Sequence, residues 1–347
     1  RAISAAVSHD LVRGVMATDA LIGTFARLGE ESLRQNVCFL YHVLGGGTGE
    51  WDVPIGGMGA VTAALAEVTV SYGAEILTGA EVVAIDPDGE VVYRVGGDER
   101  RAHGRFVLAG ITPAELARLL GEPVSPLAPG SQVKLNLVLR RLPRLHDRAV
   151  TVEQAFSGTF HVNEGFGQLE SAYSQALARQ VPDPLPCEVY CHSLTDPSIL
   201  SASLRATGAQ ALTVFGLHTP HGALDADGLR ERLANAVLAS LNSVLAEPMQ
   251  DVVMRDAQGR DCVEVKTTFD LERSLGMTAG NIFHGALTWP FAEDDEPLDT
   301  PARRWGVATA HPRVMLCGSG ARRGGGVSGV GGHNAAMAVL ESKSLPV

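Results

Sequence analysis

Two glycine-rich junctions, each joining an extended segment to a helix, constrain the fold of this chain more than any other feature. The first spans Trp51 to Gly59 and the second spans Gly318 to Gly332. Glycine has no Cβ atom, so the backbone can turn sharply or approach a ligand closely at such places. The junctions enclose a long contiguous stretch. We therefore expect a discontinuous outer domain that is interrupted by an inserted domain.

The composition indicates a globular protein of an α/β enzyme type. The 347 residues correspond to about two domains, and a hydrophobic content of 45% provides apolar surface for a large core. The net charge of −11 argues against a cationic nucleic-acid-binding surface, so we expect no nucleic-acid partner. Five cysteines are too few for a disulfide framework, which favours the cytoplasm, or the mitochondrial matrix in a eukaryote. No apolar run reaches the ~18 residues of a transmembrane helix.

We expect four parts along the chain, in a class that combines α/β and α+β. Residues 1–50 form a helical segment that packs on the inserted domain, with one or two amphipathic helices between residues 8 and 35. Residues 51–124 form the first part of the outer domain. Residues 125–295 form the inserted domain around a mostly antiparallel sheet. Residues 296–347 complete the outer domain with a strand, a glycine-rich loop and a helix.

Local patterns predict several individual elements. Residues 75–78 and 187–194 have the composition of strands, and residues 80–86 and 90–95 form a β-hairpin around a Pro-Asp-Gly turn. A helix is expected over Pro113–Leu120, because the preceding Thr is a good N-cap and a Glu stands at the third helical position.

The second glycine-rich junction is the segment most suited to bind a ligand. We expect the helix after it to cover residues 334–341 and to leave its first N–H groups unpaired, pointing at an electron-rich or anionic group. A flavin offers two such groups, its diphosphate and the N1/O2 edge of its ring. The alternative is a surface loop without a ligand. A second dinucleotide site beginning at Gly318 is not expected, because Arg323 replaces the third glycine of the motif.

Several motifs together resemble one family. Gly324-Gly325-Gly326-Val327-Ser328-Gly329 leads to His333-Asn334-Ala335-Ala336, and Trp51-Asp52-Val53-Pro54-Ile55-Gly56-Gly57-Met58-Gly59-Ala60 precedes it. This combination resembles the phytoene dehydrogenase-related flavoproteins, and more closely their branch called pyridine nucleotide-disulfide oxidoreductase domain-containing protein 2. Asn281-Ile282-Phe283-His284-Gly285 and Trp289-Pro290-Phe291 look like the same branch. The likeness runs from about residue 35 to the end.

The resemblance implies a partial glutathione-reductase-type FAD domain, with an amine oxidase-like fold, and an inserted substrate domain. It implies FAD as the cofactor and an apolar small molecule as the substrate. The backbone around Val82 and Val83 would contact the adenine. The diphosphate, the ribityl chain and the flavin ring would be contacted by Gly318, Gly320, Gly325, Gly326, Val327, Gly332, His333, Asn334 and Ala335.

The sequence departs from the family pattern at one place. Family members begin with a strand, a G-x-G-x-x-G turn and a helix that hold the FAD diphosphate, and none of these occurs upstream of residue 35. Three explanations stay open: a longer protein was shortened, a homo-oligomer or partner chain supplies the missing unit, or this form no longer binds flavin. If the unit is missing, the apolar surface that it covers would cause self-association.

Few side chains are needed for flavin-dependent hydride abstraction beyond those that hold the substrate. His284 and His333 are the candidate catalytic residues, although a structural role is the alternative for both. The substrate pocket is expected to be lined by His161, His192, His284, Trp289 and Phe291. Arg322 and Arg323 suit a diphosphate or face solvent, residues 293–296 form a solvated acidic turn, and no metal site is expected.

The leading hypothesis is an FAD-dependent oxidoreductase that dehydrogenates or saturates a carbon–carbon or carbon–heteroatom bond. Its alternatives are a flavin-free binding or interaction module, and a half-enzyme that a partner chain completes.

Overall fold

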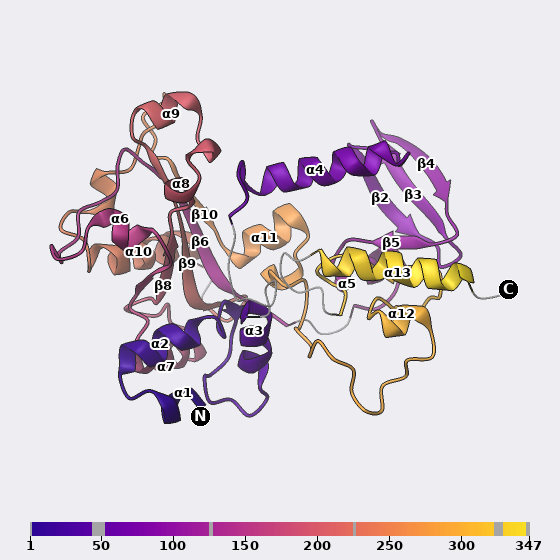
Figure 1. Ribbon diagram of the computed structural model, residues 1–347, viewed down its shortest axis with the longest axis horizontal. Coiled ribbons are helices and arrows are strands. Elements are labelled where there is room, and N and C mark those ends of the chain that lie inside the picture. The colour runs from indigo at the N-terminus through magenta and orange to yellow at the C-terminus, as the bar shows by residue number, and fades with distance from the viewer. Residues whose placement is uncertain (1, 44–52, 125–127, 225–226, 323–328, 345–347) are drawn as a thin grey trace.

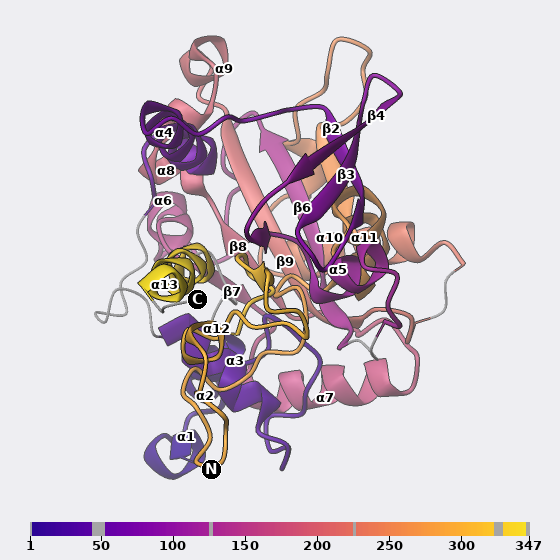
Figure 2. The ribbon, with the colours of Figure 1, turned by 90° about the vertical axis from the view of Figure 1, so that its right-hand side faces the viewer.

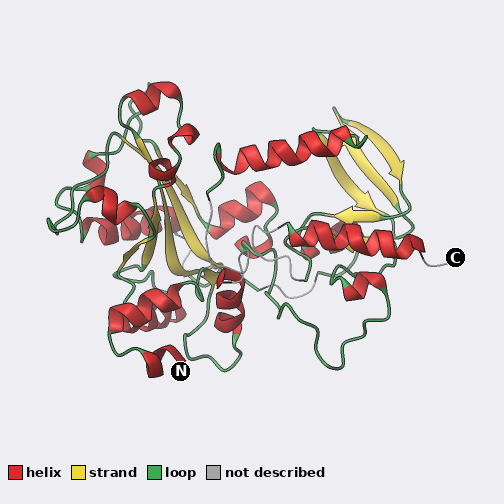
Figure 3. Cartoon of the chain, in the orientation of Figure 1, coloured by secondary structure: helices red, strands yellow, loops and turns green. Residues whose placement is uncertain are grey.

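The structure is a computed structural model that describes residues 2–43, 53–124, 128–224, 227–322 and 329–344. It combines helices with sheets that are mostly antiparallel, which confirms the expected mixed fold class (Figure 3). The main sheet lies at one end of the molecule in Figure 1, and the elements of the second glycine-rich junction lie at the other.

Six strands form the main sheet, and all its pairs are antiparallel. The strand order is β1 (Gly23–Thr24), β6 (Gly130–Leu139), β9 (Gln210–Pro220), β8 (Cys187–Tyr190) and β7 (Phe160–Val162), and β10 (Val263–Lys266) also pairs with β6. The sheet therefore joins a strand of the N-terminal segment to strands from residues 130–266.

Alternation of apolar side chains explains how β6 builds the core. Val133, Leu135, Leu137 and Leu139 are all buried, while the residues between them are half-buried. Successive side chains of a strand point to opposite faces, so these four lie on one face. The helix α10 (Leu229–Asn242) contributes residues such as Val237 to the same cluster.

Further helices surround the sheet. The helix α2 (Asp10–Thr18) packs against α7 (Phe166–Leu177). The others on this side are α1 (Ala2–Ala6), α3 (Arg34–Val43), α6 (Val152–Phe156), α8 (His192–Thr195), α9 (Ala202–Ala206) and α11 (Thr268–Leu275). Short 3₁₀ turns are η1 (Pro197–Ile199), η2 (Met249–Asp251) and η3 (Thr278–Gly280).

A parallel pair of short strands joins two distant parts of the chain. Strand β5 (Val107–Ala109) pairs with β11 (Val314–Leu316). A small core of Val307, Met315, Ala335 and Ala338 connects this pair to α13 (Val330–Ser344), which α12 (Pro301–Arg304) also contacts. The main-sheet strands β6 to β10 lie between β5 and β11 in the sequence.

A separate antiparallel sheet contains β2 (Ala80–Ile85), β3 (Glu90–Val95) and β4 (Asp98–His103). The helix α4 (Gly57–Ser71) leads toward it (Figure 2). No residue of α4 is buried, although the helix is apolar on most of its surface. Its exposed side chains include Met58, Val61, Leu65, Val68 and Val70.

Several local predictions are confirmed. The hairpin appears as β2 and β3, and α5 (Pro113–Leu119) begins after Thr112, whose side chain accepts a hydrogen bond from the Glu115 N–H. Both patterns depend on neighbouring residues, which explains why the sequence reveals them.

Other local predictions are wrong. Residues 75–78 form no strand, and they pair with no other segment. The strand expected over 187–194 ends at Tyr190, and His192 begins the helix α8. The expectation of one or two helices between residues 8 and 35 holds in part, because α2 lies there, but β1 and several turns follow it before α3 begins at Arg34.

Strand β4 and the start of α13 were also missed. Residues 98–103 are exposed throughout, so they lack the apolar alternation of a half-buried strand. They pair with β3 because Gly96 and Gly97 both adopt positive φ and form a tight turn. The helix α13 begins at Val330 instead of Asn334.

No helix in the described ranges is long and apolar enough to cross a membrane.

Substitution of Gly216 by Ala is expected to lower the free energy of unfolding by about 1–3 kcal/mol. Gly216 lies on β9, and an added Cβ would stand 2.8 Å from the side chains of Leu185 and Val133. Gly158→Ala is the control, because an added Cβ there meets nothing within 4 Å. Chemical denaturation measures the free energy of unfolding of both variants. Equal stability of the two would contradict this account of the core.

Candidate functional site

A cavity of about 720 Å³ lies between the parallel strand pair and the segment that follows η3. Its size is within the range of pockets that bind small molecules. One wall consists of residues 283–288. The opposite wall includes Pro113, Ala114 and residues 319–322, and Tyr41, Ala117, Glu122, Pro123, Ala128, Glu296, Arg303, Gly306, Ala308 and Leu316 complete the lining.

The position of the cavity follows from the direction of β5 and β11. Residues 113 and 114 follow β5 closely, and residues 319–322 follow β11. Because the two strands are parallel, both segments leave the sheet at the same edge. Ligands of parallel sheets bind outside the carboxyl ends of the strands, so this edge is the expected place for a ligand.

The other wall is held against the beginning of β6. Gly130 and Gly280 approach so closely that a Cβ on Gly130 would lie 2.1 Å from the Gly280 carbonyl oxygen. The Gln132 side-chain amide donates to the same carbonyl at 2.9 Å. The backbone of Ala279 and Gly280 has positive φ, which turns the chain toward the cavity.

Asn281 is the residue that shapes this wall. Its side chain is buried, it donates hydrogen bonds to the carbonyls of Ala128 and Gly285, and its oxygen accepts one from the Phe283 N–H. The turn that results gives His284 a φ of 65°, which is uncommon for a residue other than glycine.

His284 is one of the residues that line the cavity. Its Nδ1 atom is buried and has no hydrogen-bond partner. Burial lowers the pKa of its imidazole below the usual value, which favours the neutral ring at pH 7. A neutral imidazole can donate or accept one hydrogen bond, so His284 can position a polar atom of a ligand.

Charged groups also border the cavity. Arg322 pairs with Glu296 and donates to the Phe291 carbonyl at 3.1 Å, while its Nε has no partner. Glu296 is thus half-buried and paired, which corrects its expected place in a fully solvated acidic turn. Glu122 lies 2.5 Å from Nε2 of His311.

The glycines after β11 mainly allow segments of backbone to pack together. A Cβ on Gly331 would lie 2.4 Å from the Gly318 carbonyl oxygen, and one on Gly320 would lie 2.8 Å from the Pro113 ring. A Cβ on Gly318 would be 3.3 Å from Gly110. Gly332 differs, because it is exposed and its Cβ would meet only the Cys317 carbonyl oxygen, at 3.6 Å. Of these glycines, Gly320 lines the cavity.

The early start of α13 changes which amides are free at its N-terminus. The His333 N–H already donates to the Gly329 carbonyl, so it is engaged in the helix and is not directed at a ligand. Ala335 is buried, and the buried Asn334 side chain donates to the Trp305 carbonyl at 3.1 Å. His333 is exposed and meets Trp305 edge-on. These contacts give Asn334 and Ala335 packing roles in the fold.

The other predicted residues that the structure describes do not line the cavity. Val82 and Val83 are on β2, where Val82 is exposed. The rings of Trp289 and Phe291 stack on each other at 5.6 Å. Gly325, Gly326, Val327 and Arg323 lie outside the described residues.

The two predicted pocket histidines near β7 and β8 differ from each other. His192 is exposed and stacks on Tyr190, at 5.8 Å between the rings. His161 is on β7 and lies 2.5 Å from the Glu164 carboxylate. Burial raises the pKa of Glu188, on the adjacent strand, to about 7. Neither histidine belongs to the lining of the cavity.

The sequence did not reveal Tyr41, Pro113 and Glu122 as lining residues. They come from three separate segments, and only the tertiary fold brings them together. The positions just after Ala109, the end of β5, carried one signal, because they open the helix whose N-cap the sequence reveals, and ligand sites follow parallel strands.

Asn281→Ala is expected to lower the free energy of unfolding by about 3 kcal/mol and to increase amide exchange over residues 282–286. The variant leaves two carbonyls and one N–H without their partner. Thr288→Ala is the control, because this exposed residue lies on the same wall. The rate of amide hydrogen exchange in both variants is measured by mass spectrometry. Unchanged exchange in Asn281→Ala would show that other contacts hold the wall.

Comparison with known proteins gives relatives over most of the chain. No protein-family profile matches it. Uncharacterized proteins of Mycobacterium tuberculosis and Mycobacterium bovis are 70% identical over 343 residues, which are 98% of this chain and 64% of theirs. The rat protein named pyridine nucleotide-disulfide oxidoreductase domain-containing protein 2 is 30% identical over 353 residues. That match includes 95% of this chain and 58% of the rat protein.

Solved structures give a weaker likeness. An oxidoreductase from Methanosarcina mazei has a TM-score of 0.48 at 16% identity, over 84% of this chain and 55% of its own. Reduced UDP-galactopyranose mutase has a TM-score of 0.35 at 13% identity, over 60% of this chain and 38% of its own. The chain thus spans less than two thirds of these relatives and structures. The sequence relatives support the broad pyridine nucleotide-disulfide oxidoreductase-like group that the motifs indicate.

Proposed function

We propose that this chain is part of an FAD-dependent oxidoreductase and supplies its substrate domain and one side of its flavin site. The observation that carries the proposal is the cavity at the carboxyl ends of β5 and β11. Its walls come from the two segments whose motifs resemble flavoproteins, residues 281–285 and 318–322. The rat relative supports an oxidoreductase of the pyridine nucleotide-disulfide type.

The residues of the cavity fit the ring side of a flavin better than its diphosphate side. Gly320 leaves room beside Pro113, and the unpartnered Nδ1 of His284 offers a polar contact. Arg322 is already paired with Glu296, so its charge is largely compensated. The diphosphate would therefore be held mainly by groups outside this sequence.

When bound, FAD would supply the hydride-acceptor chemistry that dehydrogenation requires. The chain's own contribution is to hold the substrate and to exclude water. Phe283, Leu287 and Leu316 give the cavity apolar walls, which suits a largely apolar small molecule. His284 would orient a polar atom of that molecule or of the flavin.

The missing part of the flavin site is proposed to cover α4. Leu65 is 65% exposed and Val68 is 54% exposed, so no segment among the described residues covers this part of the helix. In proteins, helices gain most of their stability from packing against other segments. We infer that a dinucleotide-binding unit packs here, either from further residues of a longer protein or from a partner chain. The relatives are longer than the segment that this chain matches.

FAD is expected to bind weakly to the purified chain and to show a perturbed visible spectrum. Ala286→Trp should weaken this binding by about tenfold or more, because the indole would fill the cavity that Ala286 lines. Ala257→Trp is the matched control, at an exposed turn away from the cavity lining. The FAD affinity of all three proteins is measured by titration, followed by absorbance and flavin fluorescence.

A folded chain that leaves the flavin spectrum unchanged at every FAD concentration would favour a flavin-free binding module. Equal binding by the Ala286→Trp and Ala257→Trp variants would place the flavin elsewhere.

The chain alone is expected to self-associate through α4. Leu65→Glu combined with Val68→Lys should shift light scattering toward monomer without lowering the melting temperature, because neither side chain is buried. Leu275→Glu is the control, since Leu275 is 64% exposed on α11. A monodisperse monomer of the unaltered chain would contradict the expectation.

A further inference from the structure

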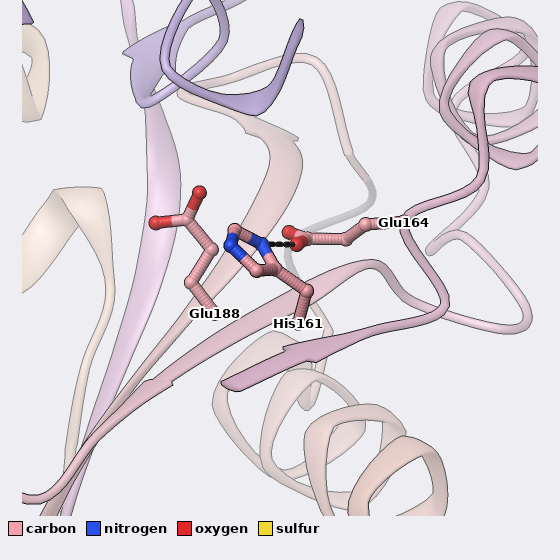
Figure 4. Close-up of side chains that lie close together, drawn as sticks. All are labelled: His161, Glu164 and Glu188. Carbon is pink, nitrogen blue, oxygen red and sulfur yellow. Dashed lines mark hydrogen bonds and ion pairs between the residues drawn. The ribbon is translucent and has the colours of Figure 1, made fainter. Parts of the chain in front are cut away.

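Three ionisable side chains meet inside the inserted domain, away from the cavity. His161 on β7 lies opposite Glu188 on β8, as direct partners in the strand register. Glu164 follows β7, and Asn163 before it has a φ of 57° that turns the chain back. Figure 4 shows the imidazole between the two carboxylates.

The three side chains have the spacing of a metal site. One ligand atom from each lies within 4.8 Å of the others. Nδ1 of His161 is 2.5 Å from a Glu164 oxygen. Only small side-chain rotations are needed to bring such atoms to the ~2.0–2.2 Å bonds of a zinc ion.

Both carboxylates are buried, at 1% exposure each. Within the described ranges, no Lys or Arg side chain forms an ion pair with Glu164 or Glu188. The Oε1 atom of each has no hydrogen-bond partner, although Oε2 of Glu188 accepts from the Tyr190 hydroxyl at 2.6 Å. A buried carboxylate without such partners is unfavourable unless a cation or a proton compensates its charge.

Packing prevents solvent from compensating these charges. The helix α2 crosses directly over this corner, where a Cβ on Gly14 would lie 1.8 Å from the Glu164 main-chain oxygen. Asp19, just after α2, adds a further negative charge that acts on both glutamates. The corner is therefore closed to solvent, and it gathers acidic side chains around His161.

We propose that His161, Glu164 and Glu188 bind a divalent transition-metal ion. An imidazole nitrogen with two carboxylates is a ligand set that suits Zn²⁺, Mn²⁺ or Fe²⁺ better than Ca²⁺ or Mg²⁺, which prefer oxygen ligands alone. Three protein ligands leave one position for water or a small ligand. This site was not expected from the sequence, because Glu188 is distant from His161 along the chain.

The bound ion would connect β7, β8 and the turn at Glu164 beneath α2. It would neutralise the two carboxylates and occupy their unpartnered oxygens. This site is separate from the proposed flavin cavity, and its existence does not depend on flavin binding.

Zinc uptake by the full chain tests the site. The chain is dialysed against a chelator and then equilibrated with Zn²⁺, and bound metal is measured by mass spectrometry. We expect about one zinc ion per chain and a higher melting temperature with zinc. Glu164→Gln and Glu188→Gln should each weaken zinc binding by more than about tenfold, because each removes one charged ligand.

His311→Gln is the matched control, because His311 also lies 2.5 Å from a glutamate, Glu122, but this pair has no third ligand in the cluster. It should keep the zinc affinity of the unaltered chain. Circular dichroism checks that the variants fold. If neither glutamine variant folds, Co²⁺ added to the unaltered chain should give the strong visible absorption of a low-symmetry site.

No zinc uptake by the unaltered chain, or unchanged affinity in both folded glutamine variants, would overturn the proposal. The absence of a cobalt band would overturn it as well. Zinc uptake without FAD binding would support the metal site and contradict the proposed function. The two proposals can therefore fail separately.

Discussion

The close approach of Gly130 and Gly280 is the constraint on which the candidate site depends. It brings the turn after η3 against the first residues of β6, where Asn281 fastens it to the Ala128 carbonyl. The position of the wall that contains His284 is therefore fixed by its contacts with the main sheet. The opposite wall belongs to β5 and β11, so the cavity exists only because both units have a fixed position beside each other.

The sequence predicted those features that depend on neighbouring residues. The Pro-Asp-Gly turn identified the hairpin of β2 and β3, and Thr112 with Glu115 identified the start of α5. The glycine-rich junction and the His284 motif were chosen as ligand-binding segments, and residues of both line the cavity. Two segments that the motifs singled out thus contribute residues to the lining of the cavity.

Features that tertiary packing decides could not be predicted. The helix α13 begins within a glycine-rich segment, where intrinsic propensity opposes a helix, because Gly331 packs on the Gly318 carbonyl. Its early start moves the free amides away from Asn334 and Ala335. His161 was expected in a substrate pocket, but its position opposite Glu188 follows from strand register, which composition does not encode. The order of the binding residues along the chain gave no sign of this pairing.

The parallel pairing of β5 with β11 also has a consequence for synthesis on the ribosome. When residues 107–109 emerge, the strand that completes their pair has not been translated, whereas the main sheet can form as soon as residue 266 is available. Contacts between distant parts of a chain form late, because closing the intervening loop costs entropy. The nascent inserted domain would thus act as a scaffold that shortens this loop, and slow or faulty folding of β6 to β10 would delay assembly of the outer unit.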